Sequence, residues 1–225
     1  MSLRTGGHKV IKLGAIAALL AATMATSGCI SLLPKPGKPP SIITMRADPS
    51  LVRTATPAPF TIGIGMPTMP ALLASNKIAV RGDDGAYGYV DRLQLSAAAP
   101  QTIQNVILET FDRAGGVRAA VRALTVARPD YEVHFDVNAF EVTEPDGGQP
   151  GIARIESGVR LVEVTTGRPL ASTIILAEVP APRGERTVPA RALEKATRQL
   201  ALQAMNWTVR TATPIHASKA ASATR

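Results

Sequence analysis

Cysteine, histidine and aromatic residues are scarce in this sequence of 225 residues. The single cysteine, Cys29, excludes an intramolecular disulfide and needs another explanation if the protein is exported. Aromatic residues make up only 4% of the chain, so the core must be built mostly from Val, Ile, Leu and Ala. Hydrophobic residues nevertheless account for 45% of the sequence and charged residues for 19%, which indicates one globular domain with tails.

Motifs for catalysis and phosphate binding are missing as well. The sequence has no Gly-x-Ser-x-Gly elbow, no His-Glu-x-x-His and no phosphate-binding loop. His134, the one histidine of the predicted domain, stands on the polar side of a strand with Glu132 and Asp136, without further residues spaced as metal ligands. We therefore expect no enzyme, no cofactor and no metal site, with His134 as the last candidate for a catalytic base.

Positive charge is scattered along the chain. The formal net charge is +8, but Arg4, Lys9 and Lys12 lie in a segment that we expect to be removed, which leaves a net charge of +5. A nucleic-acid partner would need basic residues clustered on one face. The sequence therefore predicts no nucleic-acid binding.

The first 29 residues explain the lone cysteine. A basic start is followed by an uncharged apolar stretch, Leu13 to Ala25, which is shorter than the roughly 20 apolar residues that span a bilayer. Thr26-Ser27-Gly28-Cys29 resembles a lipobox, although Thr26 stands where Leu, Val or Ile is usual. We expect residues 1–28 to be a lipoprotein signal peptide and Cys29 to carry the acyl chains, palmitate among them, that hold the protein at a membrane.

Two alternatives for this segment stay open: an ordinary signal that is cleaved near Ala25, or an uncleaved anchor. Ile30 rather than Asp follows the cysteine, and resemblance to lipoproteins of understood sorting implies transfer to the outer membrane, on its periplasmic face. Residues 29–59 are rich in proline and predict an extended tether. Residues 60–209 are the predicted domain, and residues 210–225, rich in Ala, Ser and Thr, predict a disordered tail.

Within the domain, alternating apolar residues predict strands at 60–64, 77–81, 87–93, 131–142, 154–161 and 170–176. Asp83-Asp84-Gly85 predicts a hairpin turn, and a slip in the alternation predicts a bulge near Ala139. Helical spacing predicts one helix from Pro100 to Ala114 and another from about Val188, which Trp207 packs onto the sheet. These elements indicate an α+β, two-layer domain with an antiparallel-rich mixed sheet and two helices packed on it.

Several segments in order resemble the ABC-type transport auxiliary lipoprotein family, whose members accompany MCE (mammalian cell entry) lipid-transport proteins. The matching segments are Leu72-Leu73, Lys77 to Arg81, Tyr87 and Tyr89, Asp130 to Val133, Phe140-Glu141, Gly167 to Leu170 and Trp207. Family members often have Arg-Trp after the tyrosine strand, where this sequence has Arg92-Leu93. The resemblance implies a non-catalytic component of an ABC/MCE-type lipid transport system, with an MCE-domain protein as partner and a homo-oligomer as a further possibility.

A different class of function stays open beside this one. A periplasmic scaffold lipoprotein that binds the cell wall or activates a cell-wall enzyme has a similar small α/β domain. Tyr87, Tyr89 and Arg92 are the candidate residues for binding a transport partner, because they combine rigid amphipathic surface with a charge. The alternative is that the tyrosines pack the fold and the basic residues are merely solvated. The short strand at 77–81 carries Lys77 and Arg81 at its ends, which is typical of an exposed sheet edge.

Overall fold

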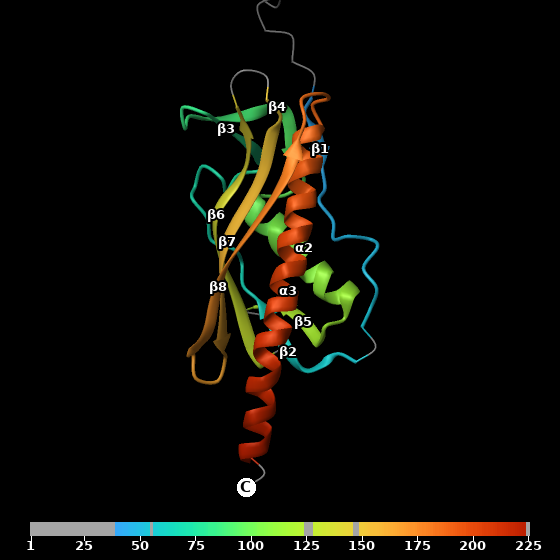
Figure 1. The fold of residues 1–225 in the computed structure, drawn as a ribbon, viewed down its shortest axis with the longest axis vertical. Coiled ribbons are helices and arrows are strands. Elements are labelled where there is room, and N and C mark those ends of the chain that lie inside the picture. Colours follow the sequence, from blue (N-terminus) through green and yellow to red (C-terminus); the bar gives the residue numbers. More distant parts are fainter. Residues whose placement is uncertain (1–38, 55, 124–127, 146–148, 224–225) are drawn as a thin grey trace, which may run out of the picture. The chain divides into compact units, whose positions relative to one another are not determined.

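A mixed sheet of eight strands carries two helices on one face (Figure 1). The computed structural model describes residues 39–54, 56–123, 128–145 and 149–223, all within the compact unit Pro39–Arg225. The strands are β1 (Ser41–Ile43), β2 (Ala58–Ile64), β3 (Lys77–Gly82), β4 (Tyr87–Leu95), β5 (Val117–Arg122), β6 (Tyr131–Glu144), β7 (Gly151–Glu163) and β8 (Pro169–Ala181). The helices are α2 (Ala99–Ala114) and α3 (Val188–Ala223). The α+β fold with a mixed sheet is therefore confirmed.

The strand order is β1-β4-β3-β6-β2-β5, and β7 and β8 continue the sheet from the other side of β6. The longest pairings, β6 with β7 and β7 with β8, are antiparallel. Four shorter pairings are parallel. The register between β6 and β7 shifts between Val137 and Ala139, which confirms the predicted bulge.

Helix α2 begins and ends where the sequence indicates. Pro100 lies in its first turn, where its missing N–H costs no hydrogen bond. Gly115 ends the helix with φ of 61°, and its N–H donates to the carbonyl of Phe111. Only glycine adopts this left-handed conformation without strain from a Cβ atom, so Gly115 fixes the end of the helix.

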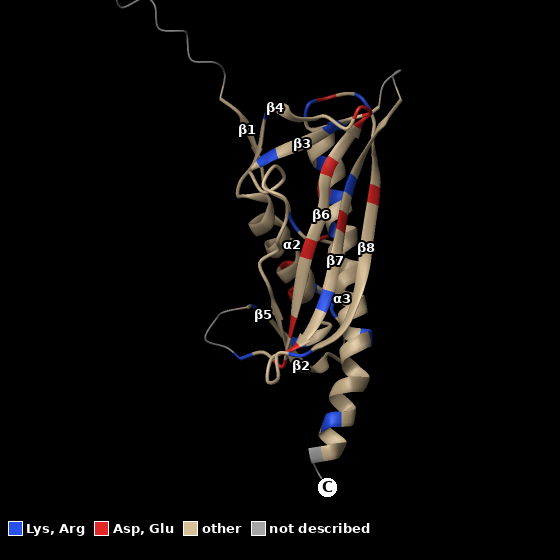
Figure 2. Ribbon diagram, turned by 90° about the vertical axis from the view of Figure 1, so that its left-hand side faces the viewer, with Lys and Arg blue, Asp and Glu red and all other residues tan. Residues whose placement is uncertain are grey.

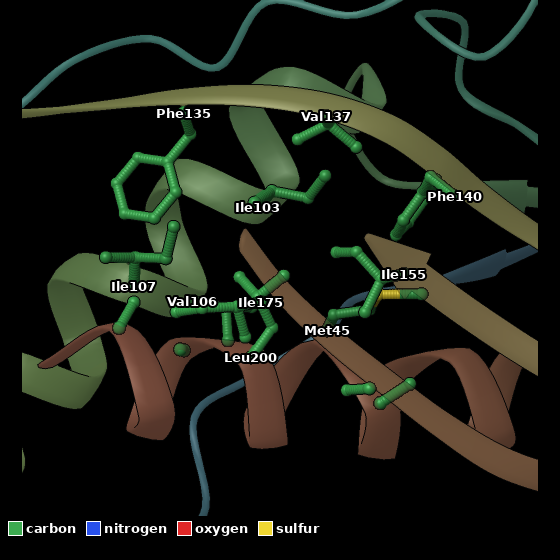
Figure 3. Packing of buried hydrophobic residues seen from close by; sticks show 14 of the residues in the cluster. Met45, Ile103, Val106, Ile107, Phe135, Val137, Phe140, Ile155, Ile175 and Leu200 are labelled. Atoms are coloured by element: carbon green, nitrogen blue, oxygen red, sulfur yellow. The ribbon is translucent and has the colours of Figure 1, made fainter. Parts of the chain in front are cut away.

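The core lies between the two helices and the sheet (Figure 3). Buried side chains come from α2, α3, the three long strands and the N-terminal segment, and include Met45, Ile103, Ile107, Phe135, Phe140, Ile155, Ile175 and Leu200. Each such side chain contributes about 1.5–3 kcal/mol by leaving water. Trp207 is partly buried against this core, which confirms its expected packing role.

The β3–β4 hairpin forms as predicted, with Gly85 at φ of 79° in its turn. The prediction that β3 is an exposed edge is wrong. Strand β3 lies between β4 and β6, and β1 adds a further strand beyond β4. The parallel pairing of β3 with β6 joins Ala79 to Glu141, which lie 62 positions apart, and no local sequence signal reports such a pairing.

The folded unit begins earlier than the predicted boundary at residue 60. Strand β1 pairs with β4, Met45 and Ala47 are buried, and the backbone N–H of Ala47 donates to Oε2 of Glu109 at 3.0 Å. The boundary was predicted too late because prolines occur throughout much of the region before residue 60. Residues 41–48 contain no proline, so this stretch is free to form a strand. The remainder of the predicted tether, residues 29–38, lies outside the described residues, as do Cys29 and the signal segment 1–28.

The prediction of a disordered tail is also wrong for residues 210–223, because α3 continues through Ala223. Ala212 is fully buried, and His216 lies 5.4 Å from the Phe60 ring, centroid to centroid. Lys219 forms an ion pair with Glu163. The alanines of this segment favour a helix, and the end of the sheet supplies the packing surface that stabilises it. None of the described helices is long and apolar enough to cross a membrane.

Candidate partner-docking site

Tyr87 and Tyr89 lie on the face of the sheet turned away from the helices. They are two positions apart on β4, so both side chains point to the same side, and each is 44% exposed. Opposite them on β3 stand Arg81 and Ala79, respectively. The predicted pairing of the two tyrosines on one face is therefore present in the structure.

A buried carboxylate fixes Tyr87. The Tyr87 hydroxyl donates to Oε2 of Glu141 at 2.7 Å, and Nε of Arg81 lies 3.0 Å from Oε1 of the same group. The Glu141 side chain is only 4% exposed, so this hydrogen bond and ion pair replace the water that it loses. The hydrogen bond to Glu141 raises the pKa of Tyr87, because it requires the protonated phenol.

Charged side chains lie next to Glu141 on the neighbouring long strands. Arg154 on β7 is the register partner of Glu141 on one side and of Glu178 on the other. Arg154 contacts Glu156 and lies 3.9 Å from Glu178. The hydrogen bond to Glu156 raises the pKa of Arg154. Figure 2 shows acidic and basic residues along β6, β7 and β8.

Tyr89 is held separately from Tyr87. Its hydroxyl donates to the carbonyl of Leu72 at 3.0 Å, and Nζ of Lys77 lies 5.1 Å from the centroid of its ring. The distance fits a cation–π contact. Both tyrosines are thus positioned by bonds at their hydroxyls while about half of each ring stays open to solvent. Such preorganised rings lose little conformational entropy when they bind a partner.

Arg92 lies apart from the Tyr87 hydrogen-bond network. It belongs to a bulge of β4, where the register to β3 shifts, and has φ of 49°. A non-glycine residue in this region is strained by about 1 kcal/mol or more. Its Nε donates to Oδ2 of Asp91 at 2.9 Å, so its charge is paired with its own neighbour. The following Leu93 is buried in the core.

His134 lies on the same sheet face, on β6. Its Nε2 stands 3.2 Å from Oε2 of Glu132, while Asp136 accepts from the Thr68 hydroxyl and pairs with Arg160. In the part of the chain that the structure describes, no group of three or more His, Cys, Asp or Glu side chains is arranged to hold a metal ion.

A groove of about 890 Å³ opens between the β3–β4 hairpin and the segment that leads into α3. Its lining includes Val80, Val90, Val142, Pro182 and Arg186. Tyr87 and Tyr89 also contribute to this lining, so the groove adjoins the strand that carries the tyrosines.

Sequence reasoning missed Glu141, Arg81 and Arg154 as members of the site. The available signal was the single charge in the apolar run Ala139-Phe140-Glu141-Val142. A buried carboxylate requires partners, and these partners lie on β3, β4 and β7, which only the sheet topology brings together.

The fold belongs to the class of two-layer α+β domains. Two helices cover one face of the sheet, and the other face is open and carries the polar network around Glu141. The sequence profile of the ABC-type transport auxiliary lipoprotein component matches residues 44–204, and the chain belongs to this family. The resemblance noted from the sequence is thereby confirmed.

Solved structures share the fold. A protein from Xanthomonas campestris aligns with a TM-score of 0.69 and 21% identity, over 78% of this chain and 99% of its own. A second crystal structure, of a protein described as uncharacterized, aligns with a TM-score of 0.57 and 13% identity, over 75% of this chain and 98% of its own. None of the curated proteins compared with the chain matches it.

Proposed function

We propose that this protein is a non-catalytic accessory lipoprotein of an ABC/MCE-type lipid transport system. Lipid on Cys29 holds it at the periplasmic face of the outer membrane, where it docks the periplasmic transport path. Membership of the auxiliary lipoprotein family supports the link to transport. The observation that carries a docking role is the tyrosine patch, defined as Tyr87 and Tyr89 on the open sheet face and held through Glu141 and Leu72.

The partner is an MCE-domain protein that contacts the tyrosine patch, with Arg92 at its margin. Rigid, half-exposed tyrosines are typical of interface hot spots, because they bury a large area on binding. The lipid anchor strengthens a weak contact of this kind by raising the local concentration of the domain near its partner.

Co-purification from detergent extracts tests this proposal. The full-length, lipidated protein should capture the MCE-domain protein, and Tyr87→Ala or Tyr89→Ala should reduce capture at a temperature where both variants are folded. Tyr89→Ala should change the melting curve little, whereas Tyr87→Ala should lower the melting temperature, because it removes a hydrogen bond from the buried Glu141. Tyr87→Phe should retain most of the capture, since it keeps the ring and loses only the hydroxyl. His134→Ala is the matched control, because His134 lies on the same face outside the patch and should bind as the unaltered protein does.

Four results would count against the proposal. Well-folded protein that captures no MCE partner would contradict the transport role, and full capture by both alanine variants would move the docking site elsewhere. Retention of the protein on purified peptidoglycan, without a transport partner, would favour the cell-wall scaffold instead. An enzymatic activity abolished by His134→Ala would contradict the non-catalytic role.

A further inference from the structure

The outer edge of β8 differs from the two other open edges of the sheet. Strand β1 has three residues, and β5 has six with exposed Arg118 and Arg122. Short length and basic side chains are the usual protection of an edge. Strand β8 has thirteen residues, pairs with β7 alone among the described strands, and carries no charge from Leu170 to Ala177.

The exposed side chains of β8 are apolar at its centre. Ile174 is 72% exposed and Leu176 is 44% exposed on the open sheet face. Ile174 stands opposite Gly158 on β7, so no side chain from that position covers it. Beside the edge lies a cleft of about 230 Å³, lined by Thr173, Ile174 and Ile175 of β8 and by the α3 residues Gln203, Asn206, Trp207 and Arg210. Proline occurs only toward the ends of β8, at Pro169 and Pro180, so the centre of the strand keeps an apolar edge beside a partly buried tryptophan, which is a favourable surface for adding a strand.

The geometry points to a second copy of this chain as the occupant of this edge. We propose that the β8 strands of two copies pair antiparallel about a two-fold axis at Ile174. Ile174 of one copy then faces Ile174 of the other, and Leu176 faces Ser172. The uncharged stretch from Ala171 to Ala177 pairs with itself in this register, with no like charges opposed.

Charge at the ends of the strand favours this register. Glu178 of one copy lies opposite Leu170 of the other and diagonal to Arg168, which is exposed just before the strand. Diagonal neighbours on paired strands lie within reach of long side chains. Glu178 and Arg168 therefore form two equivalent pairs, one at each end of the interface.

Disulfide trapping in the full-length lipidated protein tests the pairing. Ile174→Cys places two thiols at the axis, and mild oxidation should give a covalent dimer. Leu176→Cys is the matched control, because the two introduced thiols would stand about 13 Å apart along the strands, too far for a disulfide. The unaltered protein, whose Cys29 sulfur carries lipid in the proposed form, is the negative control. A dimer for Ile174→Cys and none for Leu176→Cys supports the proposal, whereas equal trapping of both, or of neither, overturns it.

A charge exchange tests the same interface without oxidation. In detergent, Glu178→Arg and Arg168→Glu should each lower the dimer fraction several-fold by native mass spectrometry, and the double variant should restore it. Ile174→Lys should give monomer with an unchanged melting temperature, while Ile152→Lys, on β7 away from the edge, should leave the dimer intact. An unaltered protein that is monomeric, or a dimer insensitive to Ile174→Lys, overturns the proposal. Because this interface lies apart from the tyrosine patch, loss of the dimer with partner capture retained separates the two proposals.

Discussion

Paired residues lie closer together in sequence in the meander of β6, β7 and β8 than in the parallel pairings of β1 to β5. Consecutive strands of the meander pair antiparallel through short connections. Strand β1 pairs with β4, β2 with β5 and β6, and β3 with β6, all in parallel. Parallel pairs need long connections, so this half of the sheet depends on contacts that form only when the whole chain has folded.

The same comparison applies to side chains. In the meander, buried and exposed residues alternate along each strand, and the apolar set faces the helices. In the β1–β5 part, the tyrosine patch draws its supporting groups from β3, β4 and β6. The meander therefore supplies most of the core, whereas the other half brings separate segments together at one surface. Four changes probe this difference, in order of falling effect.

Phe135→Ala in the meander should have the largest effect on stability. The ring is 1% exposed in the centre of the core, and removal of such a side chain costs about 3–5 kcal/mol. Urea unfolding measures the loss. Val52→Ala, at a position that is almost fully exposed, is the control and should stay within about 0.5 kcal/mol of the unaltered protein. A loss for Phe135→Ala as small as that of the control would contradict the assignment of the core.

Met45→Ala in the N-terminal segment should cost about 2–4 kcal/mol, because Met45 is 4% exposed within the same core. This substitution tests whether the segment before β2 is part of the folded domain or a free tether. A free tether would tolerate the substitution without any shift of the urea midpoint. Arg46→Ala is the neighbouring control, since its side chain is exposed and its structural bonds to Glu194 and Arg198 are made by its backbone.

Truncation after Thr211 should lower the free energy of unfolding by about 1–3 kcal/mol, because it removes the buried Ala212 and the packing of Ile215 and His216 on the sheet. Thermal unfolding should show a midpoint lower by several degrees. Truncation after Ala220, which retains these contacts and the ion pair between Lys219 and Glu163, is the control. No difference between the two shortened proteins would show that the end of α3 adds nothing to stability.

Alkaline pH should weaken the tyrosine patch by a small amount. The hydrogen bond to Glu141 raises the pKa of Tyr87 above its ordinary value of 10.0, and burial raises the pKa of Tyr131. Because each pKa is higher in the folded protein than in the unfolded chain, their stabilising contribution is complete below pH 10 and is lost as the pH rises through the folded pKa. Tyr87→Phe should reduce the drop in stability above pH 10, and Tyr131→Phe should reduce the remainder. An unchanged pH profile for Tyr87→Phe would contradict the bond to Glu141.

Much of the fold could be predicted because its signals are local. Helix α2 follows from Pro100, its apolar spacing and Gly115, and the β6 bulge follows from a slip in alternation at Ala139. The two boundary errors have one cause. Residues 41–48 and 210–223 show little hydrophobic periodicity of their own, and their order depends on the packing of Met45, Ala212 and Ile215 against a surface made elsewhere in the chain.

The sequence by itself determined the α+β class, the β3–β4 hairpin and the placement of Tyr87 and Tyr89 on one face, since periodicity and turn residues act over a few positions. It also determined the family, through the resemblance of its ordered segments to known members. Only the tertiary structure decided that β3 is internal, that β8 is a long edge strand with an apolar centre, and that Glu141 holds Tyr87 while Arg92 pairs with Asp91. The reason is physical. A buried carboxylate and an open edge are defined by which distant strands become neighbours, and that choice is made by the packing of the whole chain.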